Sequence, residues 1–148
     1  MKTIPSTIGS LLGFGITVIG LFFLIFNNYV ISKNPIIIII QLFSFCLMIW
    51  ARITFKSRSF HLAANPTEGD LITNGPYRWL RHPIYAAVIY FSLACVIAFP
   101  KIEVLVAVLF ITVGLFTRML LEEKELKKAY PEYEEYSKRA KRLIPFFF

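Results

Sequence analysis

The chain has 148 residues, of which 57% are hydrophobic and 17% charged, and its formal net charge is +7. A water-soluble domain of this length needs more polar surface, so the composition excludes an ordinary soluble domain and favours a membrane protein. The positive charge does not indicate a nucleic-acid partner, because the basic residues lie beside apolar runs, where they orient helices and attract the anionic headgroups of membrane lipids.

Four apolar segments follow one another, and each is a candidate membrane helix. They extend from about Ile8 to Tyr29, Pro35 to Ala51, Ile84 to Phe99 and Ile102 to Leu121. A spanning helix needs roughly 20 residues, which the first and fourth segments supply. The second and third are short and would need flanking residues, tilt or local thinning of the bilayer. Only Pro100 and Lys101 separate the last two segments, so these should form a tight antiparallel hairpin.

The first apolar segment carries glycines at regular spacing. Gly9 and Gly13 are four residues apart, which is the small-xxx-small spacing of closely packed membrane helices, and Gly20 follows on the same segment. This pattern predicts close packing of the first helix and suggests a homodimer that forms through it. The alternative is that the glycines have no packing role, since glycine is common in membrane helices.

The distribution of positive charge predicts the topology. Placing the N-terminus, residues 52–83 and the tail after Leu121 on one side leaves only Lys33 and Lys101 on the other. With Arg118 at the membrane edge of the first side, fourteen of the 16 lysines and arginines lie there, and the positive-inside rule assigns this side to the cytoplasm. We therefore expect both termini to be cytoplasmic.

The tail after Leu121 differs from the rest of the chain because it is charged and amphipathic. Glu123 with Lys127 and Glu134 with Lys138 are i,i+4 pairs in the orientation that supports a helix. A proline at position 131 interrupts the pattern, so we expect two short helices on the membrane surface. Their inward side chains should be Leu126, Tyr130, Tyr133 and Tyr136, and the apolar residues Ile144 and Phe146 to Phe148 should return to the interface.

Together these segments predict an all-α protein, a polytopic transmembrane helical bundle with about four spans and a C-terminal amphipathic cytoplasmic helical tail. We expect a single membrane domain over residues 1–148. Residues 1–55 should hold two N-terminal helices, 56–83 a cytoplasmic loop with a candidate cofactor motif, 84–121 a helical hairpin and 122–148 the amphipathic tail.

The loop before the third segment is the first candidate for a functional site. Residues 69–85 read Gly-Asp-Leu-Ile-Thr-Asn-Gly-Pro-Tyr-Arg-Trp-Leu-Arg-His-Pro-Ile-Tyr. Pro83 suits the first turn of a helix, and the N–H groups and dipole at such a helix start favour an anion such as a carboxylate. Tyr77, Trp79 and Tyr85 offer π faces to an adenine ring or a sulfonium cation. The alternative is an interfacial aromatic belt with positive-inside arginines, which would not need the His-Pro pair or the glycines.

The end of the fourth segment is the second candidate. Arg118 and Glu122 are four residues apart, so both side chains should project from one face of a helix. Ionisable groups at membrane depth are costly, and by default they mark a functional site or an ion pair. The alternative is an arginine that extends to the membrane surface beside a solvated run of glutamates.

Two common kinds of site are not indicated. No G-x-G-x-x-G motif follows a strand, so the soluble nucleotide-binding fold is not predicted. His61 and His82 are 21 residues apart, and no cluster of histidine, cysteine or carboxylate has metal-ligand spacing, so we expect no metal site.

Four motifs occur in the order found in one known family. They are Leu71-Ile-Thr-Asn-Gly-Pro-Tyr-Arg-Trp-Leu-Arg-His-Pro-Ile-Tyr85, Arg118-x-x-x-Glu122-Glu123-x-x-Leu126, Tyr133-x-x-Tyr136 and Arg142-x-x-Pro145. With them, residues 69–145 resemble the isoprenylcysteine carboxyl methyltransferase family, which groups with bacterial relatives and, more distantly, with phospholipid N-methyltransferases. The chain departs from that family at Ala87, where glycine is frequent, and in being shorter than the eukaryotic members.

The resemblance implies a membrane enzyme that uses S-adenosylmethionine to methylate a lipophilic carboxylate, such as an isoprenylcysteine, that enters from the bilayer. By the same resemblance the cofactor would be bound by Leu71, Ile72, Tyr77, His82, Pro83, Ile84, Tyr85 and Glu122. Arg118 would hold the acceptor, which makes Arg118 and Glu122 the candidate catalytic residues. Two alternatives stay open: methylation of a phospholipid or small molecule at N, O or S on the same scaffold, and a non-catalytic membrane subunit. We expect the protein to lie in the inner membrane of a bacterium or archaeon.

Overall fold

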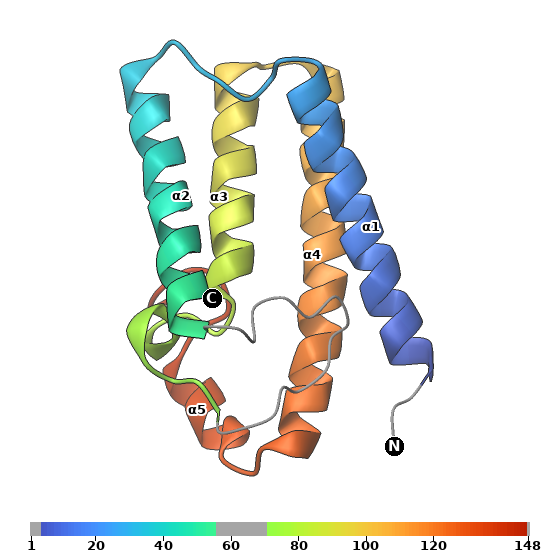
Figure 1. The fold of residues 1–148 in the computed structure, drawn as a ribbon, viewed down its shortest axis with the longest axis vertical. Coiled ribbons are helices and arrows are strands. Elements are labelled where there is room, and N and C mark those ends of the chain that lie inside the picture. Colours follow the sequence, from blue (N-terminus) through green and yellow to red (C-terminus); the bar gives the residue numbers. More distant parts are fainter. Residues whose placement is uncertain (1–3, 56–70, 148) are drawn as a thin grey trace.

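The computed structural model describes residues 4–55 and 71–147, and these fold as helices without a β-sheet (Figure 1). The helices are α1 (Ile4–Phe26), α2 (Pro35–Phe55), the short 3-10 helix η2 (Gly75–Arg78), α3 (Pro83–Ala98), α4 (Ile102–Ala129) and α5 (Tyr133–Arg139). The predicted all-α class is confirmed for this part of the chain. The predicted cytoplasmic loop lies partly outside it, because residues 56–70 are not among those described.

The four long helices run alternately up and down and form two packed pairs (Figure 1). Helix α1 packs against α4 and α2 packs against α3, while α3 also contacts α4. The α1–α2 and α3–α4 connections lie at one end of the bundle, and the loop before α3, the end of α4 and α5 lie at the other. This arrangement gathers the two candidate sites of the sequence at one end of the molecule.

Local sequence explains the two turns at the opposite end. Asn28, just after α1, has a left-handed φ of 60°, and its amide donates to the Ile25 carbonyl at 3.1 Å. The next amide, of Tyr29, donates to the Leu24 carbonyl at 2.8 Å. These two bonds form a Schellman motif, in which asparagine can take the place of glycine. Pro100 lies between α3 and α4, so the predicted tight hairpin is confirmed.

Within residues 4–55 and 71–147, three helices are long and apolar enough to cross a membrane, and they cover Thr7–Phe26, Pro35–Phe55 and Ile102–Ala129. Their outward faces carry large exposed apolar side chains, as expected of an integral membrane protein whose side chains contact lipid. Helix α2 continues beyond Ala51, where the predicted apolar segment ended, to Phe55, within the range 1–55 that was expected to hold the two N-terminal helices. With 21 residues it is not short. Helix α3 has only 16 residues, so the fourth span stays a prediction.

The tail departs from the prediction in its first half. Helix α4 continues to Ala129 instead of ending at Leu121, so the first of the two expected tail helices is the last part of α4. The residues after Leu121 are mainly glutamate, lysine and leucine, which have high helix propensity, and no helix breaker occurs before Pro131. The second expected helix is α5, and it buries Tyr133 and Tyr136 as predicted.

Three glycines of α1, Gly9, Gly13 and Gly20, pack against α4 of the same chain. A Cβ atom on Gly13 would lie 2.6 Å from the backbone oxygen of Gly114, and one on Gly20 would lie 2.6 Å from the side chain of Ile111. The two helices therefore approach more closely than a larger residue allows. The predicted close packing is confirmed as packing within the chain. The homodimer stays a prediction. The face of α1 that carries Gly9, Gly13 and Gly20 gives it no support, because α4 already covers that face.

Candidate active site

The loop that carries the His-Pro motif is fixed against the end of α2. Gly75 begins η2 with a φ of 55°, and a Cβ atom there would lie 2.6 Å from the Thr54 hydroxyl oxygen, so the position requires glycine. Two residues later, the ring of Tyr77 lies 5.5 Å from that of Phe55. Burial raises the pKa of the Tyr77 hydroxyl well above its usual range, so this side chain is neutral at physiological pH.

Helix α3 begins directly after this loop, with Pro83 in its first turn. His82 is the N-cap residue, but its side chain makes no capping hydrogen bond. The imidazole ring is instead buried and stacks on the ring of Tyr85, with centroids 5.5 Å apart and planes inclined by 1°. The first amides of α3 are thus not capped by His82, which suits the predicted binding of an anionic group at this helix start.

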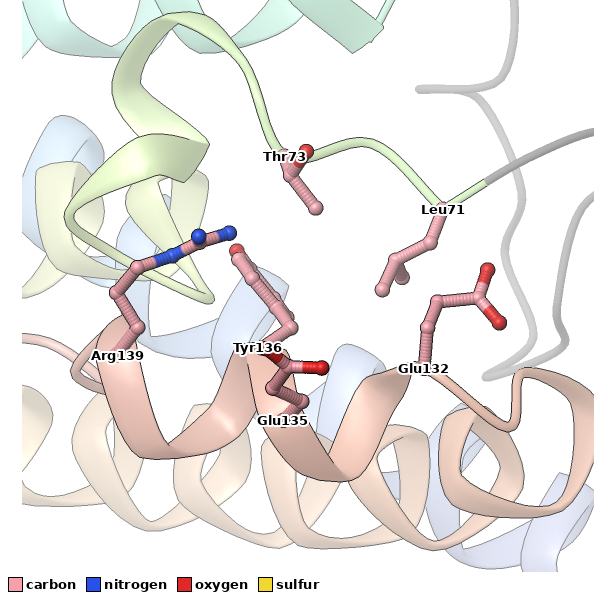
Figure 2. A pocket seen from close by; sticks show the side chains of 6 residues that line it. All are labelled: Leu71, Thr73, Glu132, Glu135, Tyr136 and Arg139. Carbon is pink, nitrogen blue, oxygen red and sulfur yellow. The ribbon is translucent and has the colours of Figure 1, made fainter.

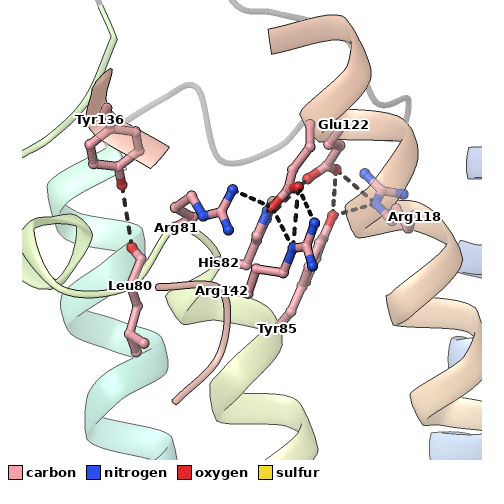
Figure 3. Close-up of polar contacts among 9 residues, drawn as sticks. Leu80, Arg81, His82, Tyr85, Arg118, Glu122, Tyr136 and Arg142 are labelled. Atoms are coloured by element: carbon pink, nitrogen blue, oxygen red, sulfur yellow. Dashed lines mark hydrogen bonds and ion pairs between the residues drawn. The ribbon is translucent and has the colours of Figure 1, made fainter. Parts of the chain in front are cut away.

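Arg118, Tyr85 and Glu122 form a connected cluster between α3 and α4 (Figure 3). The Nε of Arg118 lies 2.7 Å from the Tyr85 hydroxyl and 3.1 Å from Oε1 of Glu122. The Tyr85 hydroxyl donates to the same carboxylate oxygen. The prediction that Arg118 and Glu122 share one face of the helix is confirmed. Because Arg118 is only 6% exposed, the alternative of an arginine that extends to the membrane surface does not describe it.

A second carboxylate, that of Glu123, lies beside the first and was not predicted as a site residue. Its Oε1 lies 3.0 Å from Nη1 of Arg81 and 3.2 Å from Nε2 of His82. Its Oε2 lies 3.1 Å from Nη2 of Arg142. Glu123 is 4% exposed, and a carboxylate so buried requires such partners. The sequence features that could have identified Glu123 as a site residue are the acidic pair Glu122–Glu123 and the Arg142-x-x-Pro145 motif.

An open hollow of about 330 Å³ lies between residues 71–73 and α5 (Figure 2). It is lined by Leu71, Thr73, Glu132, Glu135, Tyr136 and Arg139. Tyr136 connects the hollow to the His-Pro loop, because its hydroxyl donates to the Tyr77 carbonyl at 2.7 Å. Burial raises the pKa of Tyr136, so its hydroxyl remains a neutral donor. The volume is sufficient for a small molecule.

The predicted site residues lie in two places at this end of the bundle. Those in direct contact with one another are His82, Tyr85, Arg118 and Glu122. Leu71 instead lines the hollow. Tyr77 and Pro83 are buried, and Ile72 and Ile84 are half-buried. The structure therefore brings the candidate catalytic pair together with part of the candidate cofactor set, and the roles of all these residues in binding stay predictions.

Comparison with known proteins identifies a family for this arrangement. The model of the isoprenylcysteine carboxyl methyltransferase (ICMT) family matches residues 34–128, from just before α2 nearly to the end of α4. The chain is also 32% identical over 116 residues to the human (Homo sapiens) protein-S-isoprenylcysteine O-methyltransferase. That alignment covers 74% of this chain and 40% of the human protein, so the chain spans less than half of the relative's length. No solved structure matches the chain significantly. The match over most of its helical bundle shows that the chain belongs to the ICMT family.

Proposed function

We propose that the protein is a methyltransferase that uses S-adenosylmethionine to methylate a lipophilic carboxylate, such as an isoprenylcysteine. Membership of the ICMT family and the name of the human relative support this type of reaction. The observation that carries the proposal for this chain is the buried Arg118, whose guanidinium lies beside Tyr85 and Glu122 on an apolar helix. A cation held at that position suits an anionic acceptor that arrives from the bilayer.

In this proposal Arg118 binds the carboxylate of the acceptor. A guanidinium binds a carboxylate through paired, charge-assisted hydrogen bonds, which fix its orientation as well as its distance. Since the Nε of Arg118 already contacts Tyr85 and Glu122, the side chain is oriented before the acceptor binds. The guanidinium would then meet the carboxylate of the acceptor. Because the acceptor is already an anion, the protein's main tasks are alignment and the exclusion of water rather than proton transfer.

The charged groups at this end of the bundle fit S-adenosylmethionine, which carries a sulfonium, an ammonium and a carboxylate. When bound, the cofactor supplies an electrophilic methyl group. Glu122 and, in the hollow, Glu132 and Glu135 offer negative charge, while Arg139 and the uncapped start of α3 suit a carboxylate. The hollow of about 330 Å³ falls within the range of roughly 300–1,000 Å³ that small-molecule sites occupy. Glu122 would bind the cofactor directly, one helical turn from the acceptor site.

We further propose that this end of the bundle faces the cytoplasm, in the inner membrane of a bacterium or archaeon. Lys33 and Lys101 belong to the α1–α2 and α3–α4 connections at the opposite end (Figure 1). The other described lysines and arginines lie on the segments that lead to the site or follow it. The positive-inside rule then places the site on the cytoplasmic side, where a polar cofactor can reach it from water.

The test is a binding and transfer experiment on the purified protein in detergent. Calorimetry should show binding of S-adenosylmethionine, and a labelled methyl group should pass to N-acetyl-S-farnesylcysteine but not to its carboxamide, which lacks the anionic oxygen. Labelling of a phospholipid amine instead of the carboxylate would favour the phospholipid alternative. No binding of the cofactor at all would overturn the proposal and favour a non-catalytic membrane subunit.

A further inference from the structure

The C-terminal segment, residues 140–143, lies alongside the His82 loop, residues 79–82. Lys141 and Leu80 form an isolated parallel bridge. The amide of Lys141 donates to the Trp79 carbonyl at 2.9 Å, and its carbonyl accepts from the amide of Arg81 at 2.6 Å. The next carbonyl, of Arg142, accepts from the amide of His82 at 3.2 Å. The backbone of the segment thus binds the loop directly before the start of α3.

Side chains join the same two pieces of chain through one carboxylate, that of Glu123. Glu123 accepts hydrogen bonds from Nε and Nη2 of Arg142 at 3.1 to 3.3 Å, and the hydrogen bonds raise the pKa of that guanidinium. The same carboxylate lies 3.2 Å from Nε2 of His82. An ionised carboxylate can only accept, so Nε2 carries the proton that Glu123 accepts. Glu123 thus helps to set the direction of the imidazole ring, together with the stacked ring of Tyr85 and with Glu122, whose Oε2 lies 3.8 Å from Nδ1.

Two tyrosines extend this attachment to other helices. The hydroxyl of Tyr90, on α3, donates to the carbonyl of Leu143. Tyr136, on α5, donates to the Tyr77 carbonyl and lies 3.5 Å from the carbonyl of Leu80. The segment and the loop are therefore held together from α3, α4 and α5. The segment binds the backbone amide of His82, and the ring of His82 contacts Tyr85 of α3 and Glu123 of α4.

We infer that Glu123 and Arg142 are positioning residues: they hold the C-terminal segment on the His82 loop and so keep His82 in the orientation that the cofactor site needs. The inference rests on the proposed function, because it assigns these residues an effect on binding of S-adenosylmethionine. Neither residue needs to touch the cofactor. A site that depends on such support loses affinity when the supporting contacts loosen, even if its own residues are intact.

Trp79 gives a readout of the loop that does not depend on the cofactor. The chain has two tryptophans, Trp50 and Trp79, whose rings lie 6.1 Å apart. In a Trp50→Phe background, which keeps an aromatic partner, the emission and acrylamide quenching of Trp79 report on the loop alone. Lys141→Ala is the matched control for Arg142→Ala, because it removes the neighbouring positive charge while the backbone bonds of the segment remain.

Arg142→Ala should shift the emission of Trp79, increase its quenching and lower affinity for S-adenosylmethionine about tenfold, with little change of turnover at saturating cofactor. Arg142→Lys should recover part of the affinity, and Glu123→Gln should have the larger effect because three partners lose their anion. Lys141→Ala should behave as the parent protein.

A lower melting temperature for Arg142→Ala with parental Trp79 emission and parental affinity would overturn the inference. If the parent protein binds no S-adenosylmethionine, the proposed function fails. Independently of that result, unchanged emission and quenching of Trp79 in Arg142→Ala would overturn the positioning role.

Discussion

The Nε of Arg118 lies 2.7 Å from the hydroxyl of Tyr85 and thereby joins α4 to α3 inside the bundle. The same hydroxyl donates to Glu122, so one tyrosine connects a cation and an anion that lie one helical turn apart. Such a cluster suits a catalytic site, and it also suits an ion pair that only holds two helices together. The two interpretations differ in what they expect of single substitutions.

Arg118→Ala should leave the affinity for S-adenosylmethionine nearly intact and reduce turnover, because the acceptor carboxylate is no longer oriented for attack. Arg118→Lys should restore only part of the activity, since an ammonium cannot reproduce the planar fork of a guanidinium. Calorimetry with the cofactor and a transfer assay with a lipophilic carboxylate check the two parts separately. A parallel fall in cofactor affinity and turnover would argue against a role of Arg118 at the acceptor.

Glu122→Gln should instead weaken cofactor binding directly. Losing one charge-assisted hydrogen bond costs roughly 1.5 to 3 kcal/mol, which corresponds to about a ten- to a hundredfold loss of affinity. The melting temperature of the same variant shows how much of the loss reflects folding. If Glu122→Gln and Arg118→Ala lower the melting temperature alike and leave the cofactor affinity unchanged, the pair is a structural ion pair and the catalytic assignment is wrong.

Tyr85→Phe removes the hydroxyl that connects Arg118 with Glu122 and should reduce cofactor affinity more than thermal stability. The matched control is Tyr29→Phe at the opposite end of the bundle. The Tyr29 hydroxyl likewise lies between a cation and an anion, because it accepts from Lys101 and donates to Glu103, both at 3.0 Å. That variant loses the same kind of contacts at an exposed position and should bind the cofactor as the wild type does. Equal affinities for the two variants would favour a purely structural role for Tyr85.

The parts of the site that could be predicted from sequence are those whose partners are close along the chain. Arg118 and Glu122 are four residues apart, so helical periodicity alone placed them on one face, and the structure confirms it. Glu123 follows immediately, but its partners His82 and Arg142 are 41 and 19 residues away. No local pattern reports contacts of that separation, since they form only when α4, the His82 loop and the C-terminal segment pack together.

The error at the end of α4 has a related cause. The predicted segment ended at Leu121 because the apolar run ends there, although the helix continues to Ala129. Hydrophobicity marks the part of a helix that lipid or protein can cover, whereas propensity and breakers determine where the helix itself ends. Because α4 continues past Leu121, Glu123 lies on the helix itself, where its carboxylate can reach His82 and Arg142.

The topology can be tested by reporters and by labelling. A reporter that is active only in the cytoplasm should be active when fused after Phe148, because the positive charges gather at the end of the bundle that contains the site. In a variant that lacks Cys46 and Cys95, Lys101→Cys, in the α3–α4 connection, should react with a membrane-impermeant reagent added from outside. An inactive fusion of this reporter, together with activity of a second reporter that works only outside the cytoplasm, would reverse the proposed orientation. Labelling of position 101 only after permeabilisation would do the same.

Gly13 and Gly15 offer a matched pair for the packing of α1 against α4. A Cβ atom on Gly13 would lie 2.6 Å from the backbone oxygen of Gly114, and neither backbone can move without separating the helices, so Gly13→Ala should destabilise the protein by about 1 to 3 kcal/mol. A Cβ atom on Gly15 would meet nothing within 4 Å. Gly15→Ala should therefore be neutral or stabilise by about 0.5 to 1 kcal/mol, the usual difference between alanine and glycine inside a helix. Melting temperatures in one detergent check both, and a Gly13→Ala variant as stable as Gly15→Ala would mean that the close contact of α1 with α4 does not contribute to stability.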